Sequence, residues 1–157
     1  MKRKLLLAGV LVLIPSMALA AGLTQHQFMA DIAYELVATP EMATCLGENR
    51  NAYLVGASFP DCGYAILNQA LSRDAHSPRF IEAFVDHIRQ TYSYPYTDQY
   101  PLISFLLGVA AHVANDPPYH AQFIREVAAR DFDGDYALAH TMCDTGLEFV
   151  TIVEHNR

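Results

Sequence analysis

Residues 102–120 read LISFLLGVAAHVANDPPYH, and this stretch decides the fold. Positions 102–115 are apolar on nearly all sides, which is typical of a helix buried in the middle of a domain. Pro117 and Pro118 should then break or kink the helix, because proline has no backbone N–H to donate. The sequence therefore predicts one central buried helix around which the rest of the chain packs.

The apolar residues keep a helical period through most of the remaining chain. Loops are expected where proline and glycine gather, in GASFPDCGY (56–64) and SYPYTDQYP (93–101), with a turn at DFDGD (131–135). Thr24 is the expected N-cap of the first helix, and Pro40 its end. The predicted helices cover residues 23–37, 43–55, 65–72, 78–92, 121–130 and 136–153. Strand patterns are weak, so we predict an all-α single domain, a helical bundle around the central helix.

The first twenty residues have the pattern of a secretory signal peptide. A basic start, Lys2 to Lys4, precedes an apolar run of about ten residues, which is too short to span a bilayer. Small residues at 18 and 20 then match the rule for cleavage after Ala20. We therefore expect an exported protein, secreted or periplasmic, whose domain occupies residues 21–157.

Residues 21–157 are strongly acidic. Three of the ten basic residues lie in the predicted signal, which leaves seven against 17 acidic residues, a net charge of about −10. This charge argues against broad nucleic-acid binding and against an anionic membrane as the main attractor. An anionic substrate is still compatible with it, because bound metal ions reverse the sign locally.

The chain has three cysteines, Cys45, Cys62 and Cys143. In an exported protein one pair can be oxidised, and we expect Cys45–Cys62 because Cys143 lies inside HTMCD (140–144). The remaining cysteine could be a zinc ligand, a buried small apolar residue or a free thiol.

Histidine and carboxylate positions recur at helical spacing in segments that otherwise have the composition of a core. His112 and Asp116 are four residues apart and share a face of the central helix, and His120 follows after four more. His140 and Asp144 repeat this spacing in the last helix. A buried carboxylate is costly unless it is paired or binds a metal. The spacing alone leaves two interpretations, a network of charged pairs in the core or a metal site.

Five segments resemble, in order, the zinc-dependent phospholipase C family, and within it the glycosylphosphatidylinositol-specific phospholipase D branch. GLTQHQFMADIAYEL is similar to the first helix of that family, and AYLVGASFPDCGY to its Gly-x-x-x-Pro-Asp loop. AHSPRFIEAFVDHIRQTY is similar to the segment that follows its second histidine. FLLGVAAHVANDPPYH resembles its His-x-x-x-Asp-x-x-x-His helix, and HTMCD its closing His-x-x-x-Asp.

The resemblance implies a cluster of two to three zinc ions and one catalytic carboxylate. The implied ligands are His26, His76, His112, Asp116, His120, His140 and Asp144. The resemblance has His76, His112 and Asp116 hold one ion, with Asp116 bridging to a second ion at His26. In the same way the resemblance implies that His120, His140 and Asp144 hold the third ion. Asp61, expected on a loop after a proline, is the implied carboxylate that orients or deprotonates the attacking water.

Two positions near the start depart from the family pattern. In the bacillary members the N-terminal amine also binds the zinc at the first-helix histidine, whereas Ala21 here lies only five residues before His26. Asp31 stands five residues after His26, where the phospholipase D-like branch can carry another histidine. Asp31 is therefore a substitute ligand or a solvated helix residue.

The resemblance implies a secreted zinc-dependent phosphodiesterase that hydrolyses phospholipid or a lipid-linked phosphodiester through metal-activated water. Transient contact with a membrane surface would accompany that activity, and the mixture of His and Asp ligands suits zinc. Two alternatives stay open: a zinc-dependent nuclease or phosphatase, and a non-catalytic zinc-binding relic of the family. The lack of a basic groove and of tryptophan argues against nucleic acid as a partner. The oligomeric state does not follow from the sequence.

Overall fold

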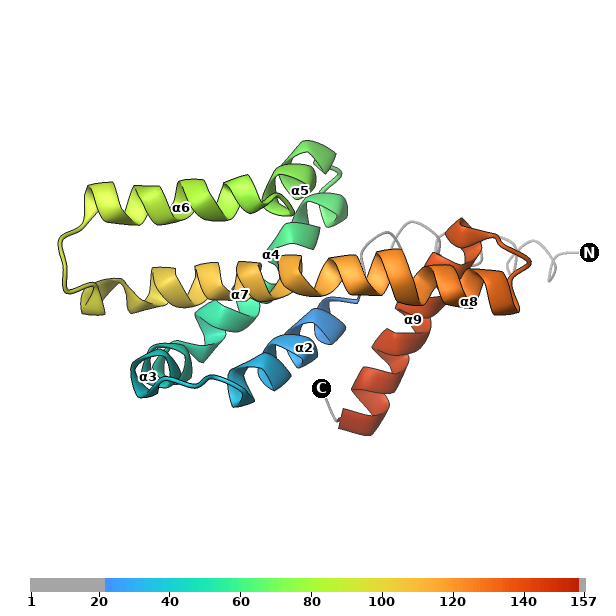
Figure 1. Ribbon diagram of the computed structural model, residues 1–157, viewed down its shortest axis with the longest axis horizontal. Coiled ribbons are helices and arrows are strands. Elements are labelled where there is room, and N and C mark those ends of the chain that lie inside the picture. The colour runs from blue at the N-terminus through green and yellow to red at the C-terminus, as the bar shows by residue number, and fades with distance from the viewer. Residues whose placement is uncertain (1–21, 156–157) are drawn as a thin grey trace, which may run out of the picture.

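The computed structural model describes residues 22–155, and the predicted signal peptide lies outside them. Helices follow one another along this part of the chain (Figure 1). They are α2 (Leu23–Glu35), α3 (Pro40–Glu48), α4 (Arg50–Ala65), α5 (Gln69–Ala75), α6 (Pro78–Thr91), the 3-10 turn η1 (Thr97–Gln99), α7 (Tyr100–Pro118), the π-helical segment η2 (Tyr119–Phe123), α8 (Ile124–Asp131) and α9 (Tyr136–His155). Residues 22–155 contain no strand, so the all-α prediction is confirmed.

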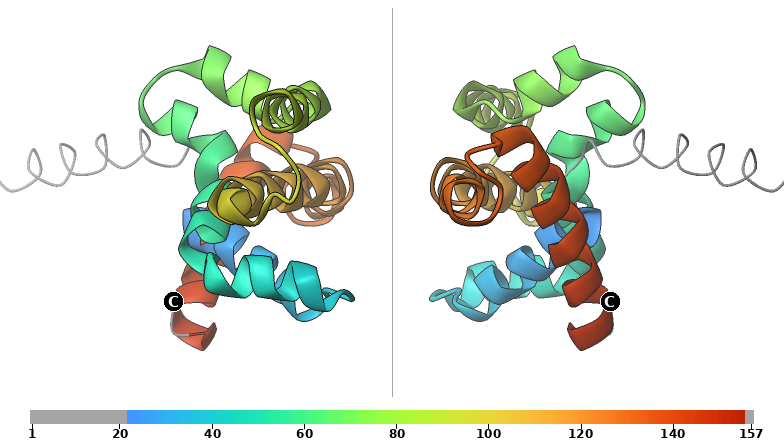
Figure 2. Two further views of the ribbon diagram at one scale, coloured as in Figure 1. Left: turned by 90° about the vertical axis from the view of Figure 1, so that its left-hand side faces the viewer. Right: turned by 90° about the vertical axis from the view of Figure 1, so that its right-hand side faces the viewer.

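The predicted central helix is α7, and it packs most extensively on α4. It runs along the long axis of the molecule, with α6 on one side and α2 and α3 on the other (Figures 1 and 2). Gly56 of α4 and Gly108 of α7 mark the crossing. A Cβ atom built on Gly108 would lie 2.0 Å from the Tyr53 carbonyl oxygen, and one on Gly56 would lie 2.0 Å from the Phe105 carbonyl oxygen. The two backbones therefore touch, which places their polar side chains next to one another.

The predicted loop at 56–64 is wrong, because α4 continues through it to Ala65. Pro60 lies inside the helix and is fully buried, so tertiary packing overrides its tendency to end a helix. Gly63 also serves packing rather than a turn, since a Cβ there would lie 2.4 Å from the Ser72 hydroxyl oxygen. Asp61 is consequently a helical residue.

The predicted break at Pro117 and Pro118 is also wrong. The chain passes from α7 into the π-helical segment η2 and then directly into α8. Two consecutive prolines remove two backbone donors from the helix, and a π-turn is a known way for a helix to continue past such a defect. This turn positions Tyr119 and His120.

The start of α2 is capped from another helix. Thr24 is not the N-cap; the Glu148 carboxylate of α9 accepts the backbone N–H groups of Thr24 (3.3 Å) and Gln25 (3.1 Å). Pro40 does not end α2, but begins α3 behind a Thr39 cap. Residues 36–39 thus connect α2 to α3, and the predicted single helix 43–55 is wrong, because Asn49 separates the end of α3 from the start of α4.

The predicted Cys45–Cys62 disulfide is wrong, because all three cysteines are free. The Cys45 sulfur lies 3.4 Å from the Ser104 hydroxyl, whereas Cys62 donates to the Ser58 carbonyl. Cys143 packs partly buried against the apolar cluster of α8 and α9, which matches the interpretation as a small apolar residue. No helix within residues 22–155 is long and apolar enough to cross a membrane.

Candidate metal centre

The predicted zinc ligands come from five different segments, and the predicted catalytic carboxylate comes from a sixth. His26 lies on α2, His76 just after α5, and His112 and Asp116 on α7. The others lie on η2 and α9, namely His120, His140 and Asp144, and Asp61 joins them from α4. The crossing of α4 and α7 brings Asp61 next to His112 and Asp116, and the other side chains approach from the neighbouring helices.

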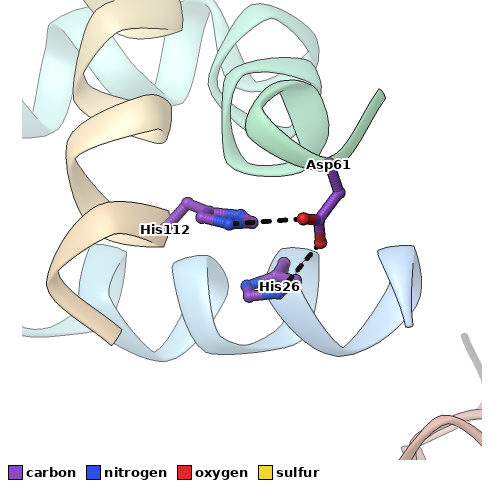
Figure 3. A group of neighbouring side chains, drawn as sticks. All are labelled: His26, Asp61 and His112. Atoms are coloured by element: carbon purple, nitrogen blue, oxygen red, sulfur yellow. Dashed lines mark ion pairs between the residues drawn. The ribbon is translucent and has the colours of Figure 1, made fainter. Parts of the chain in front are cut away.

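Two groups of potential metal ligands stand out among the described residues, and they share His112. In the first group, His26, Asp61 and His112 are all buried, and their ligand atoms lie within 4.8 Å of one another. Figure 3 shows the Asp61 carboxylate directed at both imidazoles, 3.4 Å from His26 Nε2 and 3.9 Å from His112 Nε2. The two rings stack with their centroids 3.7 Å apart.

The second group consists of His76, His112 and Asp116. The Asp116 carboxylate lies 3.1 Å from His76 Nε2 and 3.5 Å from His112 Nε2. Its other oxygen is 3.9 Å from His26 Nε2 and 3.8 Å from His120 Nε2. Asp116 therefore faces four imidazoles, which suits the predicted bridging ligand.

Backbone hydrogen bonds orient two of the imidazoles. His112 Nδ1 donates to the Ala57 carbonyl and His76 Nδ1 to the Ser72 carbonyl, each at 2.7 Å. The Nε2 atoms of the two rings are left facing each other at 3.1 Å. Two lone pairs at this distance repel unless a proton or a metal cation lies between them.

Several buried polar atoms of the cluster have no hydrogen-bond partner among the described residues. They are His26 Nδ1 and Nε2, Asp61 Oδ2, Asp116 Oδ1 and Asp144 Oδ2. Buried polar atoms are nearly always partnered in folded proteins, by protein, water or an ion. Imidazole nitrogens and carboxylate oxygens are the ligands that zinc prefers, so the donor set fits zinc.

The protonation states differ within the cluster. Burial lowers the pKa of His26 to about 4, and the neighbouring His112 acts in the same direction. Burial also lowers the pKa of His76, but hydrogen bonds to Asp116 and Asp61 outweigh it and raise the pKa to about 10. Burial raises the pKa of Asp116, yet hydrogen bonds from His112 and His76 bring it well below its ordinary value. Without metal, His76 is therefore protonated at neutral pH and His26 is neutral.

Zinc loading at pH 7.5 should release about one proton per chain from His76, because a ligating imidazole must be neutral. The proton competes with the metal, so zinc affinity should rise as the pH rises towards the His76 pKa of about 10. Titration calorimetry in buffers of different ionisation enthalpy measures the number of protons released per zinc-loaded chain. His76→Gln should release about one proton fewer than the unmodified protein. An equal release from both would contradict the assignment.

The third predicted set, His120, His140 and Asp144, is brought together only pairwise. His140 Nε2 lies 3.1 Å from His120 Nδ1, and His140 Nδ1 lies 3.3 Å from Asp144 Oδ2. His140 thus directs one ring nitrogen at each of its two neighbours. Within residues 22–155, His120, His140 and Asp144 therefore do not form a third group of converging ligand atoms. For the three residues to share one ion, at least one of their side chains must turn.

Tyr119 is a residue at this site that the sequence did not reveal. Its hydroxyl donates to Asp144 Oδ1 at 2.6 Å, in a buried environment. Burial and the Asp144 carboxylate raise the pKa of Tyr119, so its hydroxyl stays a donor at all physiological pH values. The bond holds Asp144 with its second oxygen towards His140. Tyr119 reaches Asp144 from the π-helical segment η2, and no spacing in the sequence predicts this hydrogen bond.

Tyr119→Phe should weaken zinc binding at His120, His140 and Asp144 by about tenfold or more, because bonds that orient a metal ligand typically contribute that much. The ring keeps its packing, so the fold should be unchanged. Competition with a chromophoric chelator measures the affinity. Tyr100→Phe is the matched control, because the Tyr100 hydroxyl also donates to a carboxylate, that of Glu41 on α3, which is not a predicted ligand. Equal affinities in the two variants would show that the Tyr119 hydroxyl does not act on the site.

One of the two expectations for Asp31, a solvated helix residue, is wrong. Its side chain is buried rather than solvated, and it lies outside both converging ligand groups. The Arg50 guanidinium donates to its carboxylate. Arg50 also lies over the Tyr34 ring, 5.5 Å from its centroid. Asp31 therefore joins α2 to α4 close to the metal ligands.

A family model described as zinc-dependent phospholipase C matches residues 25–156. The chain belongs to this family. Phosphatidylinositol-glycan-specific phospholipase D of Dictyostelium discoideum is 32% identical over 95% of this chain, and that of Homo sapiens is 33% identical over 69%. The chain spans only 17% and 14% of the lengths of these relatives. An uncharacterised protein of Saccharomyces cerevisiae is 30% identical over 85% of the chain. No solved structure matches.

Membership of the zinc-dependent phospholipase C family fits the chemistry of the site. The family is one of phospholipase-type hydrolases, and the described residues offer two adjoining sets of zinc-type ligands. Asp61 belongs to one of these sets, so its carboxylate lies where a ligand of the cluster would lie.

Proposed function

We propose that this protein is a secreted zinc-dependent phosphodiesterase that hydrolyses phospholipid or a lipid-linked phosphodiester. The observation that carries the proposal is the pair of ligand groups that share the buried His112. The phospholipase names of the family and of its relatives support the substrate class.

Bound zinc ions would lower the pKa of water and neutralise the charge of a phosphodiester. The chain's own residues would hold the ions in place: His26, His76, His112 and Asp116 from the two converging groups, and His120, His140 and Asp144 beside them. The Ala57 and Ser72 carbonyls fix the ring orientation of two of these histidines. Asp61 would orient the attacking water and accept its proton.

The first test is the zinc content of the purified protein, followed by an assay on phospholipid vesicles and on a glycosylphosphatidylinositol-anchored reporter protein. We expect two to three zinc ions per chain and zinc-dependent release of head group or reporter. Diacylglycerol as the lipid product would indicate cleavage of the C type, and phosphatidate cleavage of the D type. Zinc binding with hydrolysis only of single-stranded DNA or of phosphomonoesters would instead support a nuclease or phosphatase. Zinc binding without any turnover would support a relic.

Asp61→Asn should lower turnover by at least about 100-fold, the typical contribution of a positioned acid–base group. Asparagine keeps the shape of the side chain but cannot take a proton. Steady-state kinetics on the best lipid substrate would measure the effect, with Asp86→Asn on the exposed side of α6 as control. Unchanged turnover in Asp61→Asn would remove Asp61 from the mechanism.

Export is the second part of the proposal, and it rests on the basic, apolar and small-residue pattern of residues 1–20. Expression in a Gram-negative host followed by N-terminal sequencing tests it. We expect the periplasmic protein to begin at Ala21. An intact N-terminus in the cytosolic fraction would contradict export.

A further inference from the structure

The outer face of α9 is apolar and exposed along its whole length. Its exposed fractions are 47% for Leu138, 53% for Met142, 67% for Phe149 and 44% for Ile152, and Thr145 is also exposed. We call these five residues the α9 seam. No other helix of the described chain covers α9 in the view that faces it (Figure 2, right). A contiguous exposed apolar face of this kind usually marks an interaction surface.

The spacing of the α9 seam is that of a helix–helix contact. Its members follow one another at intervals of four, three, four and three residues, which is the a/d pattern of a coiled coil. The metal-site residues His140 and Asp144 are each two residues from Met142, and hence about 160° away around the helix. A partner helix on the seam would therefore leave the metal site uncovered.

The charge distribution also favours an apolar partner. None of the five seam residues is charged, although the chain as a whole is acidic. Glu148, beside the seam, caps the N-terminus of α2. Two acidic molecules could therefore meet at the seam without placing like charges opposite one another.

Two pairs of exposed apolar residues on α9 are symmetric about the middle of the helix. Met142 and Phe149 lie at equal distances on either side of the point between residues 145 and 146, and so do Leu138 and Val153, which is 74% exposed. That point is also the midpoint of α9, Tyr136–His155. Gly146 lies there, and a Cβ built on it would meet nothing within 4 Å.

A two-fold axis through this point would place Met142 against Phe149, and Leu138 against Val153, of the second copy. We propose that the protein forms a homodimer in which two α9 helices pack antiparallel across Gly146. The contact is small, because a helix of 20 residues is about 30 Å long and about 10 Å wide. Its footprint of about 300 Å² per copy is well below the ~800 Å² of a standard interface, so we expect a dissociation constant in the micromolar range.

Sedimentation velocity of the purified protein from about 1 to about 200 µM tests the dimer, because a micromolar equilibrium shifts across this range. We expect a concentration-dependent shift from monomer to dimer. Phe149→Glu should weaken the dimer at least tenfold. Val55→Glu is the matched control, because Val55 is 58% exposed but lies on α4. A monomer across the whole range, or equal effects of the two variants, would overturn the proposal.

Cysteine cross-linking tests the direction of packing. Thr145→Cys lies at the proposed axis and should form an intermolecular disulfide under mild oxidation. Leu138→Cys should not form one, because the two copies of residue 138 would lie about 22 Å apart in the direction of the helix axes. A mixture of the Leu138→Cys and Val153→Cys variants should form an intermolecular disulfide. The unmodified protein is the control for disulfides formed by the native cysteines. Efficient self-linking of Leu138→Cys would show parallel packing and overturn the proposed arrangement.

Binding to a lipid surface is the alternative use of the α9 seam. A flotation assay with phosphatidylcholine vesicles distinguishes it from the homodimer. We expect a dimer in solution whose Phe149→Glu variant loses self-association. A monomer that floats with the vesicles, and loses this property in Phe149→Glu, would overturn the dimer. Failure of the dimer would leave zinc content and phosphodiesterase activity unaffected, so the two proposals are tested separately.

Discussion

Asp116→Asn should deprive the protein of much of its bound zinc and lower phosphodiesterase activity by at least about 100-fold, because even residues that only support a metal ligand contribute 10- to 100-fold. The Asp116 carboxylate lies next to four of the histidines in the cluster. It lies within 4.0 Å of Nε2 atoms of His26, His76, His112 and His120, at 3.9, 3.1, 3.5 and 3.8 Å. An amide presents one oxygen instead of two and carries no charge, so it cannot bridge two cations equally well.

Elemental analysis after extensive dialysis measures the zinc content, and steady-state kinetics measures the activity. Asp86→Asn changes the same functional group on the exposed face of α6 and should leave both values unchanged. Circular dichroism should show that both variants remain helical. Full zinc content in Asp116→Asn would mean that Asp116 is a pairing partner in the core rather than a ligand. A folded unmodified protein that takes up no zinc would overturn the metal centre as a whole.

Gly108→Ala should lower the free energy of unfolding by about 3 kcal/mol, at the upper end of the usual cost of overpacking a core. The new methyl group would overlap the Tyr53 carbonyl oxygen (2.0 Å) and the Ala57 backbone nitrogen (2.7 Å). These are backbone atoms, so α4 and α7 would have to move apart. His112 donates to the Ala57 carbonyl across the same contact, so zinc affinity should fall with stability.

Denaturant unfolding measures the stability change, at a protein concentration well below that of self-association. Gly146→Ala is the matched control, because it is another helical glycine whose Cβ would meet nothing within 4 Å. That variant should be more stable by about 0.5–1 kcal/mol, the helix-propensity gain of alanine over glycine. If Gly108→Ala were as stable as Gly146→Ala, the close crossing of α4 and α7 would be wrong.

The Gly108→Ala prediction depends on the direct contact of two helix backbones next to the ligands. The contact brings Asp61 of α4 within 3.9 Å of His112 on α7. It also lets an α4 carbonyl fix the orientation of the His112 ring. Stability and metal binding are therefore coupled in this protein, and a change that separates the helices should impair both.

The sequence by itself determined the class of the fold, the central helix and the identity of the ligand candidates. The fold class, the central helix and the His-x-x-x-Asp pairs follow from local periodicity: an apolar run of helical length is buried, and side chains four residues apart share a face. The roles of His26, His76 and Asp61 were implied only by the resemblance to the family. The pair His112 and Asp116 meets at 3.5 Å, and the pair His140 and Asp144 at 3.3 Å, as that spacing predicts.

Only the tertiary structure decided which residues meet across helices. Pro60 and the two prolines after Asp116 are helix breakers in isolation, yet burial and a π-turn keep the chain helical through both sites. The bonds between Arg50 and Asp31 and between Tyr119 and Asp144 join segments 19 and 25 residues apart. No local period encodes such distant partners, because the energy that selects them arises only when the helices pack.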